Sequence, residues 1–171
     1  MRITTSLFFF CILLMSVQAQ DALTERMMAE ADKMGHALIV GDYDSFIPYT
    51  FPKIIDMIGG EESMRNMLET TRATMQGNGV DFSKVDFTEP SALIEKEGSI
   101  QATVRQKLIM KTPQGNLMAR SGLIALSLDE GKSWYFIDTN GKSLAELQAI
   151  IPSLSDDLEI PPTEKPVMLR N

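Results

Sequence analysis

Residues 116–138 read NLMARSGLIALSLDEGKSWYFID, two strand-like segments on either side of a short polar stretch. From 122 to 128 the first segment is apolar on both strand faces, with Ser127 as its one polar residue, as expected for a strand that is covered on both faces. The second segment contains Tyr135, Phe136 and Ile137, which are strong strand formers. The intervening residues 129–132 have the composition of a hairpin turn that ends in glycine. The stretch therefore predicts a hairpin at the centre of a sheet.

The turn of this hairpin carries a known motif. Residues 127–134, Ser-Leu-Asp-Glu-Gly-Lys-Ser-Trp, resemble the Asp-box, Ser-x-Asp-x-Gly-x-Ser/Thr-Trp. The resemblance implies that Asp129 bonds backbone amides of the turn beside Gly131 and that Trp134 packs beneath it. Asp-boxes recur in sialidase propellers, and single copies close hairpins in unrelated folds. One copy in a chain of this length predicts a structural hairpin, and a part in sugar binding is the alternative.

Before this hairpin, the apolar residues recur with the period of a helix. Residues 21–40 predict an amphipathic helix whose buried face carries Leu23, Met27, Ala31, Met34 and Leu38. Residues 43–58 predict a broken helical segment, because Pro48 and Pro52 interrupt it. After the break at Gly59 and Gly60, a third helix is expected from Glu61 to about residue 75.

After residue 79 the periodicity changes from helical to alternating. Short strands are expected over residues 81–87 and 92–96, and a longer strand over residues 100–110 leads toward the hairpin. Beyond the hairpin, Ser143 is expected to cap a short helix. From Pro152 onward, further prolines predict an extended tail; they are Pro161, Pro162 and Pro166.

Helices followed by a meander of antiparallel strands predict an α+β fold. The order of a helix, a broken helix, a third helix and a sheet with a long final hairpin resembles the NTF2-like (cystatin-like cone) superfamily. The resemblance rests most on residues 41–46, Gly-Asp-Tyr-Asp-Ser-Phe, and on residues 134–138, Trp-Tyr-Phe-Ile-Asp. It implies N-terminal helices packed on a curved antiparallel sheet around a cone-shaped interior. The expected organisation is a signal peptide at 1–19, a domain at 20–151 and a proline-containing tail at 152–171.

The first residues have the pattern of a secretory signal peptide. Arg2 supplies a positive start, residues 7–15 are an apolar core, and Ala19 ends a small-residue cleavage pattern. Cleavage after Ala19 would leave a secreted or periplasmic protein of roughly 150 residues with no segment for membrane insertion. The single cysteine, Cys11, would leave with the signal peptide, so neither a disulfide nor a thiol nucleophile is expected.

Charge and histidine content argue against several functional classes. Without Arg2, 15 of the 16 basic residues remain against 23 acidic residues, a formal charge of −8. Such a surface repels nucleic acid, so no nucleic-acid partner is expected. His36 is the only histidine and is expected on the solvent side of its helix, opposite Met27. Neither a metal nor a cofactor is therefore expected.

Acid–base chemistry by a carboxylate stays open. The NTF2-like resemblance implies it, because the superfamily includes isomerases and dehydratases with an acidic base in the cavity. Such a base needs a raised pKa, which burial among apolar walls supplies. Asp44, Asp56 and Asp138 adjoin apolar runs and are the candidates. Each also has a structural alternative: Asp44 as a helix cap, Asp56 as an exposed helical residue and Asp138 as a strand-end residue.

A ligand site would need polar groups beside an apolar interior. Arg120 shares strand parity with Ile124, so it either meets an anionic ligand at the cavity mouth or lies at the exposed start of its strand. Tyr43 and Tyr49 would supply further polar contacts unless they belong to the core. Most of the 12 methionines follow the signal peptide and suit either core packing or a flexible cavity for an apolar ligand.

Taken together, these features predict an exported, non-catalytic binding or interaction module with a pocket for a small apolar or anionic ligand. A small isomerase or dehydratase that uses a cavity carboxylate is the first alternative, so enzymatic activity stays an open question. The second alternative is an assembly partner that binds through the open sheet face or the C-terminal tail. Because NTF2-like domains often pair through the sheet, a homodimer is expected.

Overall fold

The computed structural model describes residues 4–169, with side chains from Gln20 onward. The predicted signal peptide, with Arg2, Cys11 and the cleavage site at Ala19, therefore lies outside the residues whose side chains are described. Within the described part of the chain, no helix is both long enough and apolar enough to cross a membrane.

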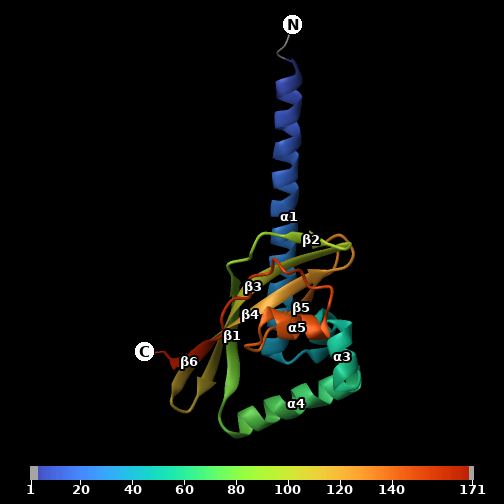
Figure 1. Cartoon of the computed structure of the whole chain (residues 1–171). Coiled ribbons are helices and arrows are strands. Elements are labelled where there is room, and N and C mark those ends of the chain that lie inside the picture. Colours follow the sequence, from blue (N-terminus) through green and yellow to red (C-terminus); the bar gives the residue numbers. More distant parts are fainter. Residues whose placement is uncertain (1–3, 170–171) are drawn as a thin grey trace.

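The protein has an α+β fold in which most of the helices precede the sheet. The helices are α1 (Thr4–Val40), α2 (Tyr43–Phe46), the 3-10 turn η1 (Ile47–Tyr49), α3 (Pro52–Ile58) and α4 (Glu61–Gly77). The strands follow as β1 (Asp81–Thr88), β2 (Ile94–Lys96), β3 (Ser99–Thr112), β4 (Gly115–Ser127) and β5 (Tyr135–Asp138). The short helix α5 (Leu144–Ile150) and the strand β6 (Glu164–Met168) complete the chain (Figure 1). The predicted fold class is confirmed.

The breaks in the helical segment between α1 and α4 have local causes. Asp42 caps α2, since its carboxylate accepts a hydrogen bond from the Ser45 amide at 3.1 Å. Pro52 occupies the first turn of α3, where its missing N–H is tolerated. Gly59 ends α3 in the left-handed region with a φ of 100°, which glycine adopts without strain.

The sheet is antiparallel and is built around the long hairpin of β3 and β4. Its strand order is β1-β3-β4-β5, with β2 added to β3 and β6 added to β4. The hairpin predicted over residues 116–138 corresponds to β4 and β5, which pair from Leu123↔Asp138 to Leu126↔Tyr135. The first half of β4 pairs instead with β6, where Arg120 lies opposite Glu164. β4 therefore has neighbours on both sides over most of its length.

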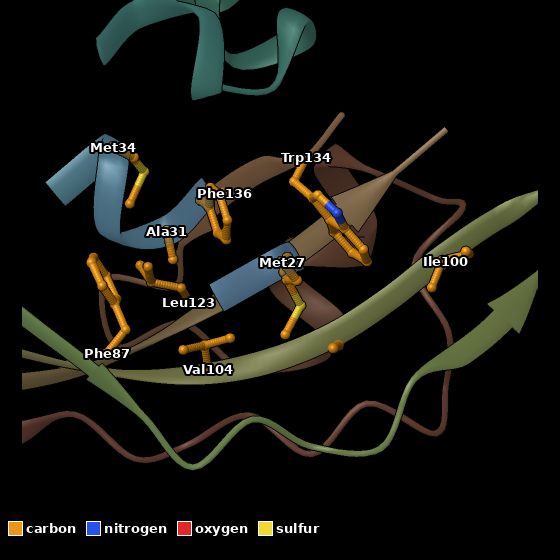
Figure 2. Packing of buried hydrophobic residues seen from close by; sticks show 11 residues of the cluster. Met27, Ala31, Met34, Phe87, Ile100, Val104, Leu123, Trp134 and Phe136 are labelled. Carbon is orange, nitrogen blue, oxygen red and sulfur yellow. The ribbon is translucent and has the colours of Figure 1, made fainter. Parts of the chain in front are cut away.

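One face of the sheet packs against the second half of α1. Figure 2 shows the buried cluster there, which includes Met27, Ala31 and Met34 of α1 and Val104, Leu123 and Phe136 of the sheet. The α1 residues belong to the face that the helical period predicted. Gly35 lies close to the same sheet face, because a Cβ added there would stand 2.5 Å from Val85 Cγ1. Only glycine allows the helix and the sheet to approach this closely.

The opposite face of the sheet is covered by α5 and by the segment that follows it (Figure 1). Its buried cluster contains Ile124, Leu126, Ile137, Leu147, Ile151, Leu154 and Leu158. This differs from the extended tail predicted from Pro152 onward, because Leu154 is fully buried and Leu158 is only 4% exposed. Residues 152–160 thus pack into the domain, and the regular extended segment is confined to β6. Because this segment is mainly polar and contains proline, its sequence did not indicate that Leu154 and Leu158 belong to the core.

A buried glutamine ties the same segment to the sheet. Gln101 of β3 has no exposed surface, and its Nε2 donates to Ser99 Oγ at 2.8 Å and to Ser153 O at 2.9 Å. Its Oε1 accepts a hydrogen bond from Ser155 N at 2.8 Å. Because the side-chain amide is fully satisfied, its burial is compatible with a stable core and fixes where the segment crosses the sheet.

Candidate functional site

The space between α1 and the sheet is largely filled by side chains. The cluster in Figure 2 occupies it, including Met27, Trp134 and Phe136. A cavity of about 100 Å³ remains beside Met34 and Phe87. Ligand pockets usually measure roughly 300–1,000 Å³, so this space suits at most a ligand of a few atoms.

A larger, mainly apolar cavity lies at the edge of the sheet where β5 ends. It has a volume of about 300 Å³. Its walls come from α3 and α5, which lie near each other in Figure 1. Its lining residues are Ile54, Met57 and Ile58 of α3, Leu147, Ile150 and Ile151 at α5, and Ile137, Asp138, Asn140 and Lys142 around the end of β5. We call this space the α3–α5 cavity.

The wall that α3 contributes is only partly covered by the rest of the protein. No residue of α3 is buried, although the helix carries Ile54, Ile55, Met57 and Ile58. Met57 is 63% exposed. The chain just before α3 is held to β5 by an edge-on contact between Phe51 and Tyr135, whose ring centroids lie 5.7 Å apart. An apolar helix that stays partly open to solvent beside a cavity is a common feature of binding sites.

Asp138 borders both this cavity and the smaller one beneath α1. Its carboxylate accepts a hydrogen bond from Asn140 N at 2.8 Å, so it also stabilises the turn into α5. Burial raises the pKa of the Asp138 carboxyl, and the bond from Asn140 opposes the rise. Solvent still reaches the side chain. The pKa therefore rises because neighbouring atoms surround Asp138 at the concave wall of the cavity. The side chain is not enclosed in the dry core.

The other two candidate carboxylates face solvent. Asp44 is exposed and forms an ion pair with Arg65 of α4. Asp56 is an exposed residue of α3 and does not line the α3–α5 cavity. The capping role considered for Asp44 belongs to Asp42. Of the three candidates, Asp138 is the one that lies at a cavity.

Arg120 lies on the sheet face opposite α1, beside the C-terminal strand. Its Nη1 donates to Glu164 Oε2 at 2.9 Å, while Arg105 donates to the other oxygen of the same carboxylate at 3.2 Å. Arg120 lines neither the α3–α5 cavity nor the space beneath α1. Its observed role is to help hold β6 against β4.

The two candidate tyrosines connect helices to their neighbours. Tyr43 is buried, and its hydroxyl donates to Leu68 O at 3.4 Å. Tyr49 donates to Glu30 Oε2 at 2.8 Å, and burial together with this bond raises the pKa of Tyr49 to about 12. Tyr49 also borders an open groove of about 550 Å³ along α1 that includes His36, which is exposed. Neither tyrosine lines the α3–α5 cavity.

The hairpin turn between β4 and β5 is held by Asp129. Its Oδ1 accepts hydrogen bonds from Lys132 N at 3.1 Å and Ser133 N at 2.9 Å, and its Oδ2 accepts one from Ser133 Oγ at 2.7 Å. Gly131 has a φ of 80°, and Trp134 is 2% exposed. These residues build the turn and do not line the α3–α5 cavity.

Two parts of the cavity lining carry no functional signal in the sequence: the polar residues Asn140 and Lys142 beside Asp138, and the apolar side of α3. Asn140-Gly141 is a typical turn dipeptide, but nothing local indicates that this turn closes one end of a cavity. The walls come from α3 and α5, which the whole central sheet separates along the chain. Among the described residues, no cluster of His, Cys, Asp and Glu side chains is suited to hold a metal ion.

Comparisons with known proteins bear on the fold. No model of a protein family and no curated protein matches this sequence. A solved structure of a protein from Catenulispora acidiphila is similar, with a TM-score of 0.50 and 15% sequence identity. The match covers 72% of this chain and 96% of the other chain. At this level of identity, the similarity shows a shared fold alone.

Proposed function

We propose that the protein is a non-catalytic module that binds a small, mainly apolar ligand in the α3–α5 cavity. The observation that carries the proposal is the cavity itself, about 300 Å³ between apolar walls with polar groups at one end. Small-molecule sites typically combine an apolar lining with a few polar groups that orient the ligand. The proposed site differs from the cone interior expected from the sequence, where only about 100 Å³ remains.

The size of the cavity limits the ligand to a short chain or a small ring. Each buried methylene group contributes about 0.8 kcal/mol, so about six buried carbons contribute about 5 kcal/mol. This corresponds to a dissociation constant of about 0.1–1 mM when the ligand loses little freedom on binding. We therefore expect weak and reversible binding of short alkyl compounds.

A carboxylate-dependent isomerase or dehydratase is the alternative that Asp138 favours. Asp138 borders the cavity, and burial raises the pKa of its carboxyl. Such an enzyme also needs a proton donor on the far side of the substrate. The other polar lining residues, Asn140 and Lys142, belong to the same turn as Asp138 and not to an opposing wall. For this reason we favour ligand binding over catalysis as the proposed function.

The sequence patterns support inferences about the superfamily, the location and the oligomeric state of the protein. The order of helices before an antiparallel sheet supports membership of the NTF2-like superfamily, and the pattern of residues 1–19 supports export to the periplasm or beyond the cell. The same resemblance implies pairing of two copies through the sheet, but α1 covers one sheet face and α5 with the segment after it covers the other, so the structure offers no open face for it. These three inferences leave the identity of the ligand open, so the cavity itself must be tested.

The test is a titration of the full chain with 1-octanol, followed by calorimetry or NMR, with two matched variants. Met57 lines the cavity and Met67 lies on α4 away from it, and their exposed fractions are 63% and 45%. A tryptophan at position 57 would occupy the open side of the cavity. Met57→Trp should therefore weaken 1-octanol binding about tenfold, the equivalent of about 1.4 kcal/mol. Met67→Trp should bind as the unaltered chain does.

Two results would contradict this proposal. One is the absence of 1-octanol binding to the unaltered chain at millimolar concentrations. The other is equal binding by Met57→Trp and Met67→Trp, which would place the ligand elsewhere on the molecule. Turnover of an added β,γ-unsaturated ketone that depends on Asp138 would instead favour the enzymatic alternative.

A further inference from the structure

The polar end of the α3–α5 cavity carries two opposite charges. Asp138 and Lys142 are the charged residues among those that line it, and apart from Asn140 the rest of the lining is apolar. Asp138 ends β5, and Lys142 follows the turn after it. All three polar residues are exposed, so a molecule that enters the cavity from solvent can reach each of them.

Neither of these charges is neutralised by a neighbour. No ion pair joins Lys142 to Asp138, and neither residue forms an ion pair with any other described residue. The Asp138 carboxylate accepts the hydrogen bond from Asn140 N through one oxygen, Oδ1, so Oδ2 can accept from a ligand. Polar groups at one end of an apolar cavity are typical of a site that orients a ligand by its head.

The carboxylate of Glu146, which lies near Lys142, is bonded within its own helix cap. It accepts hydrogen bonds from the Ser143 amide at 2.8 Å and from the Ser143 hydroxyl at 2.7 Å. These bonds, and to a smaller extent the charge of Lys142, hold the pKa of Glu146 below its usual range. Glu146 does not line the α3–α5 cavity. The Lys142 ammonium is therefore available to an anionic group inside the cavity.

Two opposite charges at one end of a cavity discriminate between ligand heads. A head with a single charge is attracted by one of the two groups and repelled by the other. A head that carries both an ammonium group and a carboxylate can pair with both groups at once. The side-chain amide of Asn140 can donate to such a head and accept from it. This combination of apolar walls and paired charges matches an α-amino acid with an apolar side chain.

We propose that the α3–α5 cavity binds a free α-amino acid with an aliphatic side chain, such as leucine. The side chain lies between the apolar residues of α3 and α5, the carboxylate pairs with Lys142 and the ammonium group pairs with Asp138. The cavity volume of about 300 Å³ admits a molecule of this size. This inference rests on the proposed function, because it gives the ligand of the same cavity a chemical class.

Three compounds with the same branched alkyl group test the two-charge head. Leucine carries both charges, 4-methylpentanoate carries only the carboxylate, and 3-methylbutylamine carries only the ammonium group. In NMR titrations of the full chain at neutral pH, leucine should bind about three- to fivefold more tightly than either analogue, the usual effect of a charge pair at an exposed site. Glycine has the same head but no side chain, so it should bind at least about tenfold more weakly than leucine.

Two variants remove one charge each. Lys142→Gln should weaken the binding of leucine about three- to fivefold and should not weaken that of 3-methylbutylamine. Asp138→Asn should weaken the binding of leucine by a similar factor and should not weaken that of 4-methylpentanoate. Asparagine keeps an oxygen for the hydrogen bond from Asn140 N, so the turn should stay folded.

Lys53→Gln and Asp56→Asn are the matched controls. Both residues are exposed on α3, and neither lines the α3–α5 cavity. Each control variant loses the same charge as its counterpart at the cavity, so the comparison removes the effect of net charge. Both controls should bind leucine within about twofold of the unaltered chain.

The outcomes distinguish this inference from the proposed function. Binding of 1-octanol without binding of leucine would overturn the amino-acid ligand, while ligand binding in the α3–α5 cavity stands. Leucine binding no tighter than that of both analogues, or no tighter than that of glycine, would also overturn it. The same is true if Lys142→Gln weakens leucine and 3-methylbutylamine equally, because the loss would then not depend on the carboxylate. Failure of the unaltered chain to bind leucine, its analogues or 1-octanol would overturn both proposals.

Discussion

Asp129 accepts four hydrogen bonds within its own turn, from Ser127, Lys132 and twice from Ser133. The hydroxyl and the amide of Ser133 contribute most to holding the pKa of Asp129 at about 2. The carboxylate lies near the surface, so solvent screens its charge and the benefit to stability is moderate. Hydrogen bonds over so few residues are a local property, which is why the motif in the sequence anticipated this arrangement.

The first prediction concerns the pH dependence of this turn. Asp129→Asn should lower the free energy of unfolding by about 1 kcal/mol at pH 7, because an amide replaces the ionised acceptor. The folded state holds the pKa of Asp129 below its ordinary value, so the stabilisation is complete above about pH 4 and is lost as the pH falls toward 2. Urea unfolding at several pH values measures the difference.

Glu130→Gln is the control for this prediction, because Glu130 is exposed in the same turn and its contact with Lys132 is a surface ion pair of 3.6 Å. Its effect should stay within about 0.5 kcal/mol at every pH. A loss in Asp129→Asn that is the same at pH 7 and near pH 2 would show that the charge of the carboxylate is not the cause.

The contact between α1 and the sheet depends on the absence of a side chain at Gly35. An added Cβ would stand 2.5 Å from Val85 Cγ1 and 2.7 Å from Phe87 Cε2. Phe87 is buried in the cluster under α1, so it has little freedom to move away. Within a helix, glycine is otherwise unfavourable by about 1 kcal/mol relative to alanine. The packing of two elements therefore outweighs the local preference of one of them.

The second prediction compares two helical glycines. Gly35→Ala should lower the free energy of unfolding by about 1–3 kcal/mol, since α1 must move away from β1 to make room. Gly77→Ala should be neutral or stabilising by up to about 1 kcal/mol, because nothing lies within 4 Å of a Cβ added there. Urea unfolding of both variants is the measurement. Equal effects at the two positions would mean that α1 does not approach the sheet this closely.

The molecule as a whole has buried clusters on both faces of one sheet. The first, under α1, uses the amphipathic helix; the second depends on α5 and on residues 151–160. Gln101 joins the sheet to Ser153 and Ser155, more than 50 positions away. The C-terminal segment is thus part of the structure that positions α5, and α5 in turn forms one wall of the α3–α5 cavity.

The third prediction compares two truncations. A chain that ends at residue 163 loses β6, whose five residues are all exposed, so its stability should fall by only about 1 kcal/mol. A chain that ends at residue 151 also loses Leu154 and Leu158, worth about 1.5–3 kcal/mol each, and leaves Gln101 without Ser153 and Ser155. Because whole domains are stable by only about 5–15 kcal/mol, the shorter chain should not fold cooperatively.

Thermal unfolding followed by circular dichroism measures both truncations. The chain ending at 163 should keep a single sharp transition close to that of the full chain. A sharp transition at nearly the same temperature for the chain ending at 151 would show that the second cluster is dispensable, contrary to its burial in the structure.

Local patterns by themselves determined the order and type of the elements as far as α5, whereas β6 lies in the segment that was expected to be an extended tail. The helical period identified the buried face of α1, the prolines and Gly59 marked the breaks around α3, and alternation placed the strands of the sheet. The hairpin turn at Asp129 could also be predicted from the sequence, because its hydrogen bonds link residues at most four positions apart. Interactions of this range depend only on residues that are close in the sequence. They can therefore be predicted without knowledge of the tertiary structure.

Only the tertiary structure decided which surfaces meet. Nothing near Leu154 or Leu158 indicates that the sheet covers them, nothing near Gly35 indicates contact with Val85, and nothing near Asp138 indicates a cavity beside α3. The aspartates at 44, 56 and 138 looked alike in the sequence, and their surroundings in three dimensions separated them. The physical reason is that burial, cavity volume and the loss of hydration are sums over residues distant in the chain, so no local pattern contains them.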